Sequence, residues 1–172
     1  MLLNIEDYRR RACAVLLRFV HDYIERSADD GHCMRRNAGD LSAIELTPRV
    51  LRDTTQVDTS VEVFGRKWAQ PFGIAPTGLN GLVRPEGDRL LAAAVGEAGI
   101  PFSLSTASNM RLEDVRAAAP GGVQWMQLYV MRREMASQIV ERAQKDGYQA
   151  LALTVDVPVS GNRELGTEAK AD

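Results

Sequence analysis

Short apolar segments alternate with amphipathic helical segments over the second half of the chain. The predicted strands are 72–76, 102–105, 123–129 and 150–156, and the predicted helices between them are 87–98, 112–119 and 132–145. A helical segment separates each strand from the next, which is the kind of connection that parallel strands require. The pattern therefore predicts an α/β fold in which about four βα units form a parallel sheet.

The residues that precede the sheet follow a different pattern. Asn4 can cap a helix whose apolar residues recur at helical spacing to about Glu25. Residues 27–40 are polar and predict a loop or a short helix, and residues 46–59 predict an irregular connection. Gly65 lies between two short β-prone runs and predicts a hairpin. We therefore expect one domain that contains an N-terminal helical segment (1–60), a hairpin (61–70), four βα units (71–160) and a tail (161–172).

Charge and cysteine content restrict the kind of partner. The formal net charge is −2 and no basic cluster is visible, which argues against nucleic-acid binding. Cys13 and Cys33 have neither metal-site nor redox-motif spacing, so we expect no metal ligands. The N-terminus lacks a basic region followed by an apolar one, and the apolar run 12–17 is too short to cross a membrane. These features predict a reduced, cytoplasmic protein without a membrane signal in this chain.

Polar side chains occur where the predicted strands end. Alternation places Gln127 on the same face as Tyr129, near the end of the third strand. Ser105 and Thr154 hold similar positions on the neighbouring strands, and residues 76–78 form a bend after the first. Because the C-terminal ends of parallel strands share one edge, these groups should meet at one mouth, where α/β proteins bind ligands. A buried amide without partners costs roughly 1–3 kcal/mol, so Gln127 should meet polar groups or a planar ligand with mixed donors and acceptors.

Each of these residues also has a purely structural interpretation. Gln127 and Tyr129 fit polar residues that the backbone satisfies, and Tyr23, judged alone, fits the core of a helix. His21 lies on a predicted helix and His32 in a polar loop, where surface or packing roles suit them better than that of a catalytic base. Taken one at a time, the residues leave ligand binding and structural roles open.

An ordered set of short motifs resembles the FMN-dependent α-hydroxy acid dehydrogenase and oxidase family, a (β/α)8 TIM-barrel group. The matching motifs are Phe19-Val-His-Asp-Tyr23, Ile74-Ala-Pro-Thr-Gly78, Leu104-Ser-Thr-Ala-Ser-Asn109, Gln127-Leu-Tyr129, Leu153-Thr-Val-Asp156 and Gly161-Asn-Arg-Glu164. Each motif is short, but their order and spacing match the family over about residues 4–164. The motifs at 76–81 and 104–110 are most similar to those of the mandelate-oxidising members.

The resemblance implies a flavin site with a substrate site beside it. Pro76, Thr77 and Gly78 would contact FMN through backbone atoms, and Ser105, Gln127 and Thr154 would hydrogen-bond the pyrimidine edge of its ring. The substrate, a small 2-hydroxy acid, would be bound by Tyr23, Tyr129 and Arg163. Its carboxylate would meet Tyr23 and Arg163, and its hydroxyl would lie by Tyr129. Ala107 stands where several relatives carry a bulky aromatic residue, which leaves room for a phenyl-bearing acid such as mandelate.

The resemblance also indicates which parts of such a site these residues do not supply. The family's catalytic histidine, a second substrate arginine and the phosphate-binding loops lie in the later half of the barrel, and none has a counterpart here. After Glu164 the sequence departs from the family, and a whole barrel typically needs about 250 residues. We therefore expect an N-terminal half barrel that contains no catalytic residue and is inactive alone, whereas the full-length protein would form a homo-oligomer. The resemblance leaves two locations open for the full-length protein, the cytoplasm and a membrane surface.

Two alternatives remain at this stage. One is a non-catalytic half barrel that associates with a partner or with itself, because its first and last strands would otherwise have unpaired edges. The other is a barrel half that holds a different phosphate-bearing cofactor.

Overall fold

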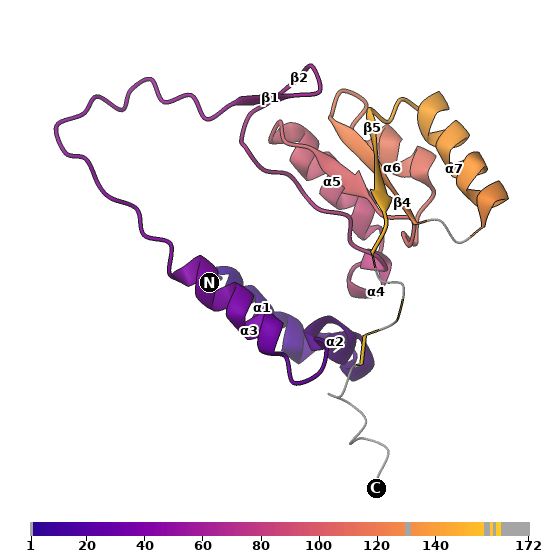
Figure 1. Cartoon of the computed structure of the whole chain (residues 1–172), viewed down its shortest axis with the longest axis horizontal. Coiled ribbons are helices and arrows are strands. Elements are labelled where there is room, and N and C mark those ends of the chain that lie inside the picture. Colours follow the sequence, from indigo (N-terminus) through magenta and orange to yellow (C-terminus); the bar gives the residue numbers. More distant parts are fainter. Residues whose placement is uncertain (1, 130–131, 157–158, 160, 163–172) are drawn as a thin grey trace, which may run out of the picture. The chain divides into compact units, whose positions relative to one another are not determined.

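The computed structural model describes residues 2–129, 132–156, 159, 161 and 162. The chain divides into two compact units, one within Met1–Asp53 and Val157–Asp172 and the other Thr54–Asp156. Each unit has its own helices, and the strands belong to the second (Figure 1).

The first unit contains three helices. They are α1 (Ile5–Val15), α2 (Arg18–Glu25) and α3 (His32–Ser42). Asn4 caps α1 as predicted, because its side-chain oxygen accepts a hydrogen bond from the Asp7 N–H at 2.8 Å. The prediction of one continuous helix to about Glu25 is wrong. Leu16 and Leu17 have non-helical ψ angles of 147° and 138°, and they separate α1 from α2.

The polar segment after α2 contains a helix, which was one of the two predicted alternatives. The helix α3 starts after Gly31, whose φ of 76° lies in the left-handed region that glycine adopts at little cost. The His32 N–H donates to the Asp30 carboxylate at 3.0 Å and fixes this start. Residues 46–59, all of which the structure describes, form neither a helix nor a strand, so the predicted irregular connection is confirmed.

The second unit begins with the predicted hairpin. Its antiparallel strands are β1 (Val61–Val63) and β2 (Arg66–Trp68). The turn residues Phe64 and Gly65 have φ angles of 50° and 69°, as in the tight turns whose twist suits a hairpin. The rings of Phe64 and Trp68 lie 5.6 and 5.5 Å from the ring of Trp125, so the hairpin packs on the parallel sheet.

A three-stranded parallel sheet follows, in the order β3-β4-β5. Its strands are β3 (Phe102–Leu104), β4 (Gln124–Tyr129) and β5 (Ala150–Thr154), and the helices of this unit are α4 (Asn80–Val83), α5 (Gly87–Glu97), α6 (Leu112–Ala118) and α7 (Arg133–Lys145). The strands neighbour one another in chain order, so the sheet grows in one direction, as a barrel does, without the reversal of a doubly wound sheet. Figure 1 shows α5, α6 and α7 beside the strands. The predicted α/β class is confirmed, and the described strands form an open sheet.

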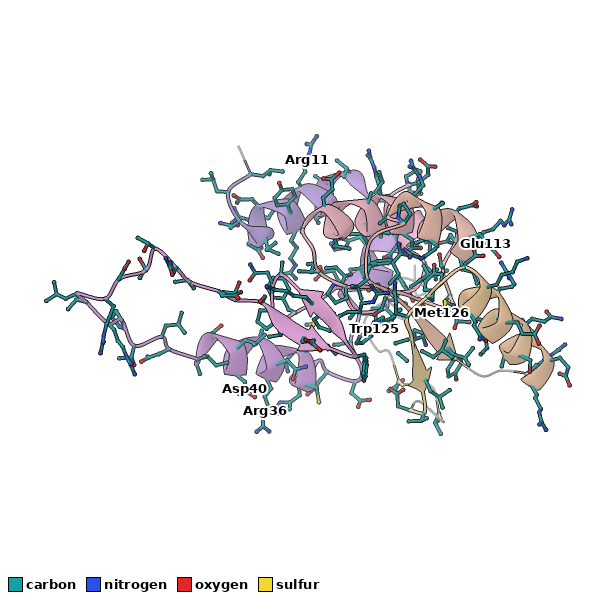
Figure 2. All side chains as sticks on the ribbon, turned by 90° about the horizontal axis from the view of Figure 1, so that it is seen from above. Arg11, Arg36, Asp40, Glu113, Trp125 and Met126 are labelled. Carbon is teal, nitrogen blue, oxygen red and sulfur yellow. The ribbon has the colours of Figure 1, made fainter. Side chains whose placement is uncertain are left out.

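The core of this unit lies on one face of the sheet. In β4, Met126 and Leu128 are buried, whereas Trp125, Gln127 and Tyr129 at alternate positions are more exposed. Figure 2 labels Trp125 and Met126, which are consecutive residues of β4. Met126 packs in an apolar cluster with residues of the three longer helices, namely Ala92, Val95, Leu112, Val115 and Ala143. The helices therefore cover the Met126 face, and the face that carries Gln127 is the less covered one.

The predicted strand 72–76 is reduced to one bridging residue. The Ile74 N–H donates to the Pro101 carbonyl at 2.9 Å, and the Ile74 carbonyl accepts from the Ser103 N–H at 3.0 Å. A Cβ on Gly73 would lie 2.4 Å from the Pro101 ring, so the two backbones approach more closely than a side chain allows. Prolines at positions 71, 76 and 101 also lack the N–H groups that a longer ladder needs. The prediction is therefore wrong for the residues around Ile74.

Candidate functional site

Three predicted site residues form one hydrogen-bonded row at the C-terminal end of the sheet. Gln127, on the middle strand, donates from Nε2 to Thr154 Oγ1 at 2.5 Å. Its Oε1 accepts from the Ser105 hydroxyl at 3.2 Å and from the Thr106 N–H at 2.9 Å. We call Ser105, Gln127 and Thr154 the amide row. The expectation that Gln127 meets polar groups from the neighbouring strand ends is confirmed.

The amide row keeps hydrogen-bonding capacity for a ligand. Thr154 Oγ1 accepts from Gln127 and can donate its own proton elsewhere, and Gln127 Nε2 carries a second N–H. The Ser105 hydroxyl is oriented on both sides, because it donates to Gln127 and accepts from the Ala107 N–H at 3.1 Å. These donors fit the acceptors along the edge of a planar heteroaromatic ring.

The predicted bend lies against the loop that follows β3. The bend is formed by Pro76, Thr77 and Gly78. A Cβ placed on Gly78 would lie 3.0 Å from Ala107 Cβ and 3.8 Å from Ser105 Oγ. The bend therefore meets the amide row at Ser105, and the missing side chain of Gly78 allows the approach.

A short helix that the sequence did not predict continues this bend. Leu79 precedes α4 and has a φ of 59°, a left-handed conformation that strains a residue with a side chain. Its N–H donates to the Ala107 carbonyl at 3.0 Å, which holds the strained residue against the loop after β3. Backbone strain of this kind concentrates at functional loops.

A buried carboxylate also connects the bend to the loop after β3. Asp88, in the first turn of α5, is 1% exposed. Its two oxygens accept from Asn80 Nδ2 and from the Ser108 hydroxyl, each at 2.6 Å. Asn80 Nδ2 also donates to the Thr77 carbonyl at 3.1 Å. Sequence reasoning missed Asp88, because an acidic residue in a first helical turn ordinarily indicates only a favourable interaction with the helix dipole.

The three residues predicted to bind the substrate lie in different parts of the chain. Tyr129 ends β4 at the same edge as the amide row and is 41% exposed. Its N–H donates to Thr106 Oγ1 at 3.0 Å. Tyr23 lies on α2 in the first unit, and Arg163 lies outside the described residues. The structure thus brings Tyr129 to the amide row, and the substrate roles of all three residues stay predictions.

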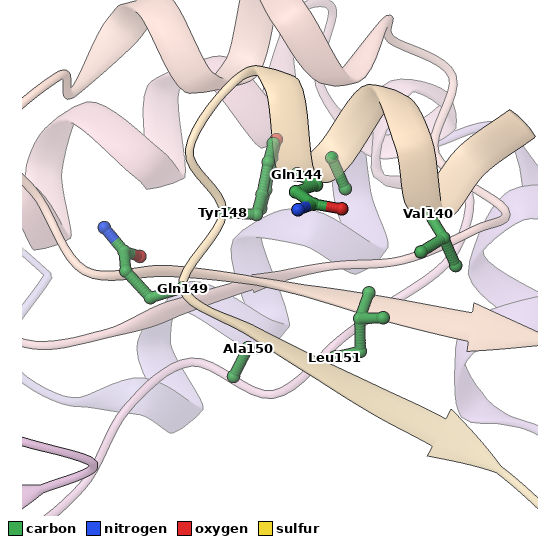
Figure 3. A pocket seen from close by; sticks show the side chains of 7 residues that line it. Val140, Gln144, Tyr148, Gln149, Ala150 and Leu151 are labelled. Atoms are coloured by element: carbon green, nitrogen blue, oxygen red, sulfur yellow. The ribbon is translucent and has the colours of Figure 1, made fainter.

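A separate pocket lies between α7 and β5 (Figure 3). It is lined by Val140, Ala143, Gln144, Tyr148, Gln149, Ala150 and Leu151. It contains no predicted site residue, so it is distinct from the amide row. Across the part of the chain that the structure describes, no three His, Cys, Asp or Glu residues gather as metal ligands. Within the same residues, every helix is too short or too polar to cross a membrane.

Comparison with known proteins assigns the chain to a family. A sequence profile described as FMN-dependent dehydrogenase matches residues 12–171. The matched range includes every predicted site residue.

Curated relatives match nearly the whole chain. The (S)-mandelate dehydrogenase of Pseudomonas putida is 43% identical over 163 residues, which are 95% of this chain and 41% of the relative. The 2-hydroxyacid oxidase 2 of Homo sapiens is 39% identical over 163 residues, which are 94% of this chain and 46% of the relative. The chain thus spans less than half the length of these relatives.

Solved structures with the same fold agree with this result. A soluble mutant of the membrane-associated (S)-mandelate dehydrogenase from Pseudomonas putida has a TM-score of 0.88 and 43% identity, over 95% of this chain and 47% of that one. A mandelate oxidase mutant with a C4a-OH-FMN adduct has a TM-score of 0.84 and 34% identity, over 92% of this chain and 48% of that one. These neighbours are (β/α)8 enzymes, so the predicted barrel family is confirmed and the open sheet corresponds to part of a barrel.

Proposed function

The chain belongs to the FMN-dependent dehydrogenase family, and we propose that it supplies part of a site that binds FMN and a 2-hydroxy acid. The single observation that carries this proposal is the amide row at the open end of the sheet, where Gln127 and Thr154 keep donors that no other described residue occupies. The relatives named above are a mandelate dehydrogenase and a 2-hydroxyacid oxidase, which supports this substrate class.

In this proposal, the amide row would hold FMN by hydrogen bonds to the pyrimidine edge of its ring. The donors of Gln127 and Thr154 fit the carbonyl and nitrogen acceptors of that edge. Gly78, which has no side chain, lets the backbone of the bend approach the ring from the side of Ser105. When bound, FMN accepts the two electrons that leave the substrate.

The role of the amide row is electrostatic preorganisation. Gln127 is held by Thr154 of β5 and by Thr106 in the loop after β3, so its N–H groups need little reorganisation when negative charge develops beside them. The same hydrogen bonds fix which end of the amide faces Thr154. We infer that the row stabilises the reduced form of the cofactor.

In this proposal Tyr129 would meet the substrate hydroxyl, and the roles of Tyr23 and Arg163 in binding the substrate carboxylate rest on the family resemblance alone. Ala107 is small and exposed in the loop that contacts Gly78. A small side chain at this position leaves space for a phenyl group, so we propose an aromatic 2-hydroxy acid such as mandelate.

We propose that the chain alone binds without turnover. Removing the proton of a substrate hydroxyl near neutral pH needs a base such as histidine. The two histidines are His21, which is close to Asp22 on α2, and His32, which starts α3. Neither matches the catalytic histidine of the family, which lies in the later half of the barrel.

Flavin fluorescence tests the proposed site directly. FMN added to the purified chain should be quenched in a saturable titration. Gln127→Leu removes the centre of the amide row and should weaken binding about tenfold, which corresponds to about 1.4 kcal/mol. Gln138→Leu makes the same change at an exposed position of α7 and should bind as the wild type does. Absence of saturable quenching, or equal affinity of both variants, would refute the proposal.

Anaerobic addition of (S)-mandelate to the FMN-loaded chain tests the proposed inactivity. We expect the oxidised flavin spectrum to persist. Rapid bleaching would show that a base within this chain suffices.

A second candidate function is association through the sheet. Leu151 and Leu153 of β5 are 47% and 58% exposed, which is unusual for consecutive outward residues of a parallel strand. A half barrel that pairs with a partner or a second copy would cover them. Light scattering should then give a mass well above 18.9 kDa, and a stable monomer would refute self-association.

The cytoplasmic location and the homo-oligomer of the full-length protein stay predictions. The relative from Pseudomonas putida is described as membrane-associated. Fractionation of cells that express the chain distinguishes the two locations, because a cytoplasmic protein stays in the supernatant after ultracentrifugation.

A further inference from the structure

The pairing of β3 with β4 continues beyond the last residue of β3, through a side chain. The backbone register ends with Leu104 opposite Met126. Two residues further on, the Thr106 hydroxyl donates to the Gln127 carbonyl at 2.5 Å and accepts from the Tyr129 N–H at 3.0 Å.

These two backbone groups are the ones that a ladder residue would use. In a parallel ladder, a residue opposite position j bonds to the carbonyl of j−1 and to the N–H of j+1. The register places Thr106 opposite Leu128, so its ladder partners would be the Gln127 carbonyl and the Tyr129 N–H. The Thr106 hydroxyl has taken both of them.

The exchange releases the backbone of Thr106 for another contact. Its N–H donates to Gln127 Oε1 at 2.9 Å, beside the bond from Ser105. The Ser105 hydroxyl and the Thr106 N–H are both donors, so the side-chain oxygen of Gln127 must face them. Its Nε2 therefore points toward Thr154. A flipped amide would place donor against donor.

We propose that Thr106 is a positioning residue that sets the orientation of Gln127 and the place of Tyr129. Its hydroxyl anchors the end of β4, and its backbone N–H fixes the side chain that would meet the ligand. The effect on ligand binding rests on the proposed function, whereas the effect on the strand does not.

Substitution of Thr106 by valine or by serine distinguishes the effect of the hydroxyl group from the effect of the side-chain shape. Thr106→Val keeps the branched shape but leaves the Gln127 carbonyl and the Tyr129 N–H without this partner. Thr106→Ser keeps the hydroxyl and should restore the wild-type behaviour. Thr59→Val is the matched control, because the Thr59 hydroxyl donates to the Ala69 carbonyl at 3.1 Å in the hairpin region.

Amide hydrogen exchange by NMR on the full chain is the first measurement. Exchange at Tyr129 should accelerate at least tenfold in Thr106→Val and stay near the wild-type rate in Thr106→Ser and Thr59→Val. Unchanged exchange at Tyr129 in a folded Thr106→Val variant would overturn the proposal. If valine prevents folding, Thr106→Ala removes the same hydroxyl without the bulk and takes its place.

FMN affinity, measured by flavin fluorescence, is the second measurement. Thr106→Val should weaken binding several-fold, with rescue by serine. Equal affinity of wild type and Thr106→Val would overturn the positioning role toward the ligand. Faster exchange at Tyr129 in a chain that binds no FMN would support the role of Thr106 in the strand while refuting the proposed function.

Discussion

Asp88 and Ser108 lie twenty positions apart in the sequence and share a hydrogen bond of 2.6 Å, from the serine hydroxyl to the buried carboxylate. The other oxygen of Asp88 accepts from Asn80. One charged group therefore connects the bend at 76–78 to the loop after β3, and both segments border the amide row.

Loss of the Asp88 carboxylate should destabilise the second unit. Asp88→Ala removes the acceptor of the Ser108 hydroxyl and one of the two acceptors of Asn80 Nδ2, so the free energy of unfolding should fall by about 1–3 kcal/mol. Urea denaturation followed by circular dichroism measures the change. Glu97→Ala removes an exposed carboxylate from the same helix and should change the free energy by less than about 0.5 kcal/mol. Equal effects of the two variants would show that the buried bonds contribute little.

Gly78 should tolerate no side chain where the bend meets Ala107. The added Cβ of Gly78→Ala would lie 3.0 Å from Ala107 Cβ, which is closer than normal packing, so the bend or Ala107 must shift by a few tenths of an ångström. We expect a several-fold loss of FMN affinity by fluorescence titration. Gly39→Ala is the control, because it adds a Cβ in open space on α3 and should leave FMN binding unchanged. An unaltered affinity of Gly78→Ala would argue against a cofactor beside this bend.

The ion pair between α6 and α7 should make stability depend on pH in acid. Arg142 donates to both oxygens of Glu113 at 2.7 and 2.8 Å, and this hydrogen bonding lowers the pKa of Glu113 to about 2. Because the folded-state pKa lies below the unfolded value of about 4.3, the pair stabilises above that value and its contribution is lost as the pH falls toward 2. Both side chains are partly exposed, so the contribution should stay below about 1 kcal/mol.

Substitution of Glu113 checks this pH dependence. Glu113→Gln should flatten the decline in the free energy of unfolding between about pH 4 and pH 2. Glu141→Gln, at an exposed position on α7, should retain the wild-type slope. Parallel curves for wild type and Glu113→Gln would contradict the assignment.

The aromatic contact between the hairpin and the sheet should contribute to stability. Phe64 occupies a left-handed turn position and its ring lies 5.6 Å from that of Trp125. Phe64→Leu should lower the free energy of unfolding by about 0.5–1.5 kcal/mol and shift the emission of Trp125. Phe72→Leu, at a residue outside the two ring contacts with Trp125, serves as the comparison and should leave the emission of Trp125 unchanged. Indistinguishable emission spectra of wild type and Phe64→Leu would exclude this contact in solution.

Local chemistry in the sequence was sufficient for most elements of the second unit, but not for α4 or for the residues around Ile74. The helices α5, α6 and α7 and the strands β4 and β5 lie within a few residues of their predicted bounds, because apolar periodicity and glycines such as Gly99 and Gly147 act over short distances. The meeting of Ser105, Gln127 and Thr154 also followed from alternation, since parallel strands end at one edge.

The sequence did not indicate where such local rules fail. Nothing in residues 16 and 17 marks the break between α1 and α2, and the strand around Ile74 was lost to a close backbone approach against Pro101. The first outcome depends on the backbone angles of two residues, and the second depends on a contact with a residue distant in the sequence. The periodicity of apolar residues contains neither kind of information.

The sequence by itself thus determined the α/β order, the family and the residue types at the open end of the sheet. The tertiary structure decided the partners: that the side-chain oxygen of Gln127, and not its nitrogen, faces the Thr106 N–H, that Asp88 is buried between two loops, and that a hydroxyl replaces the ladder opposite Leu128. The physical reason is that hydrogen-bond direction and burial depend on the three-dimensional arrangement of several segments, whereas strand and helix patterns depend mainly on near neighbours in the chain.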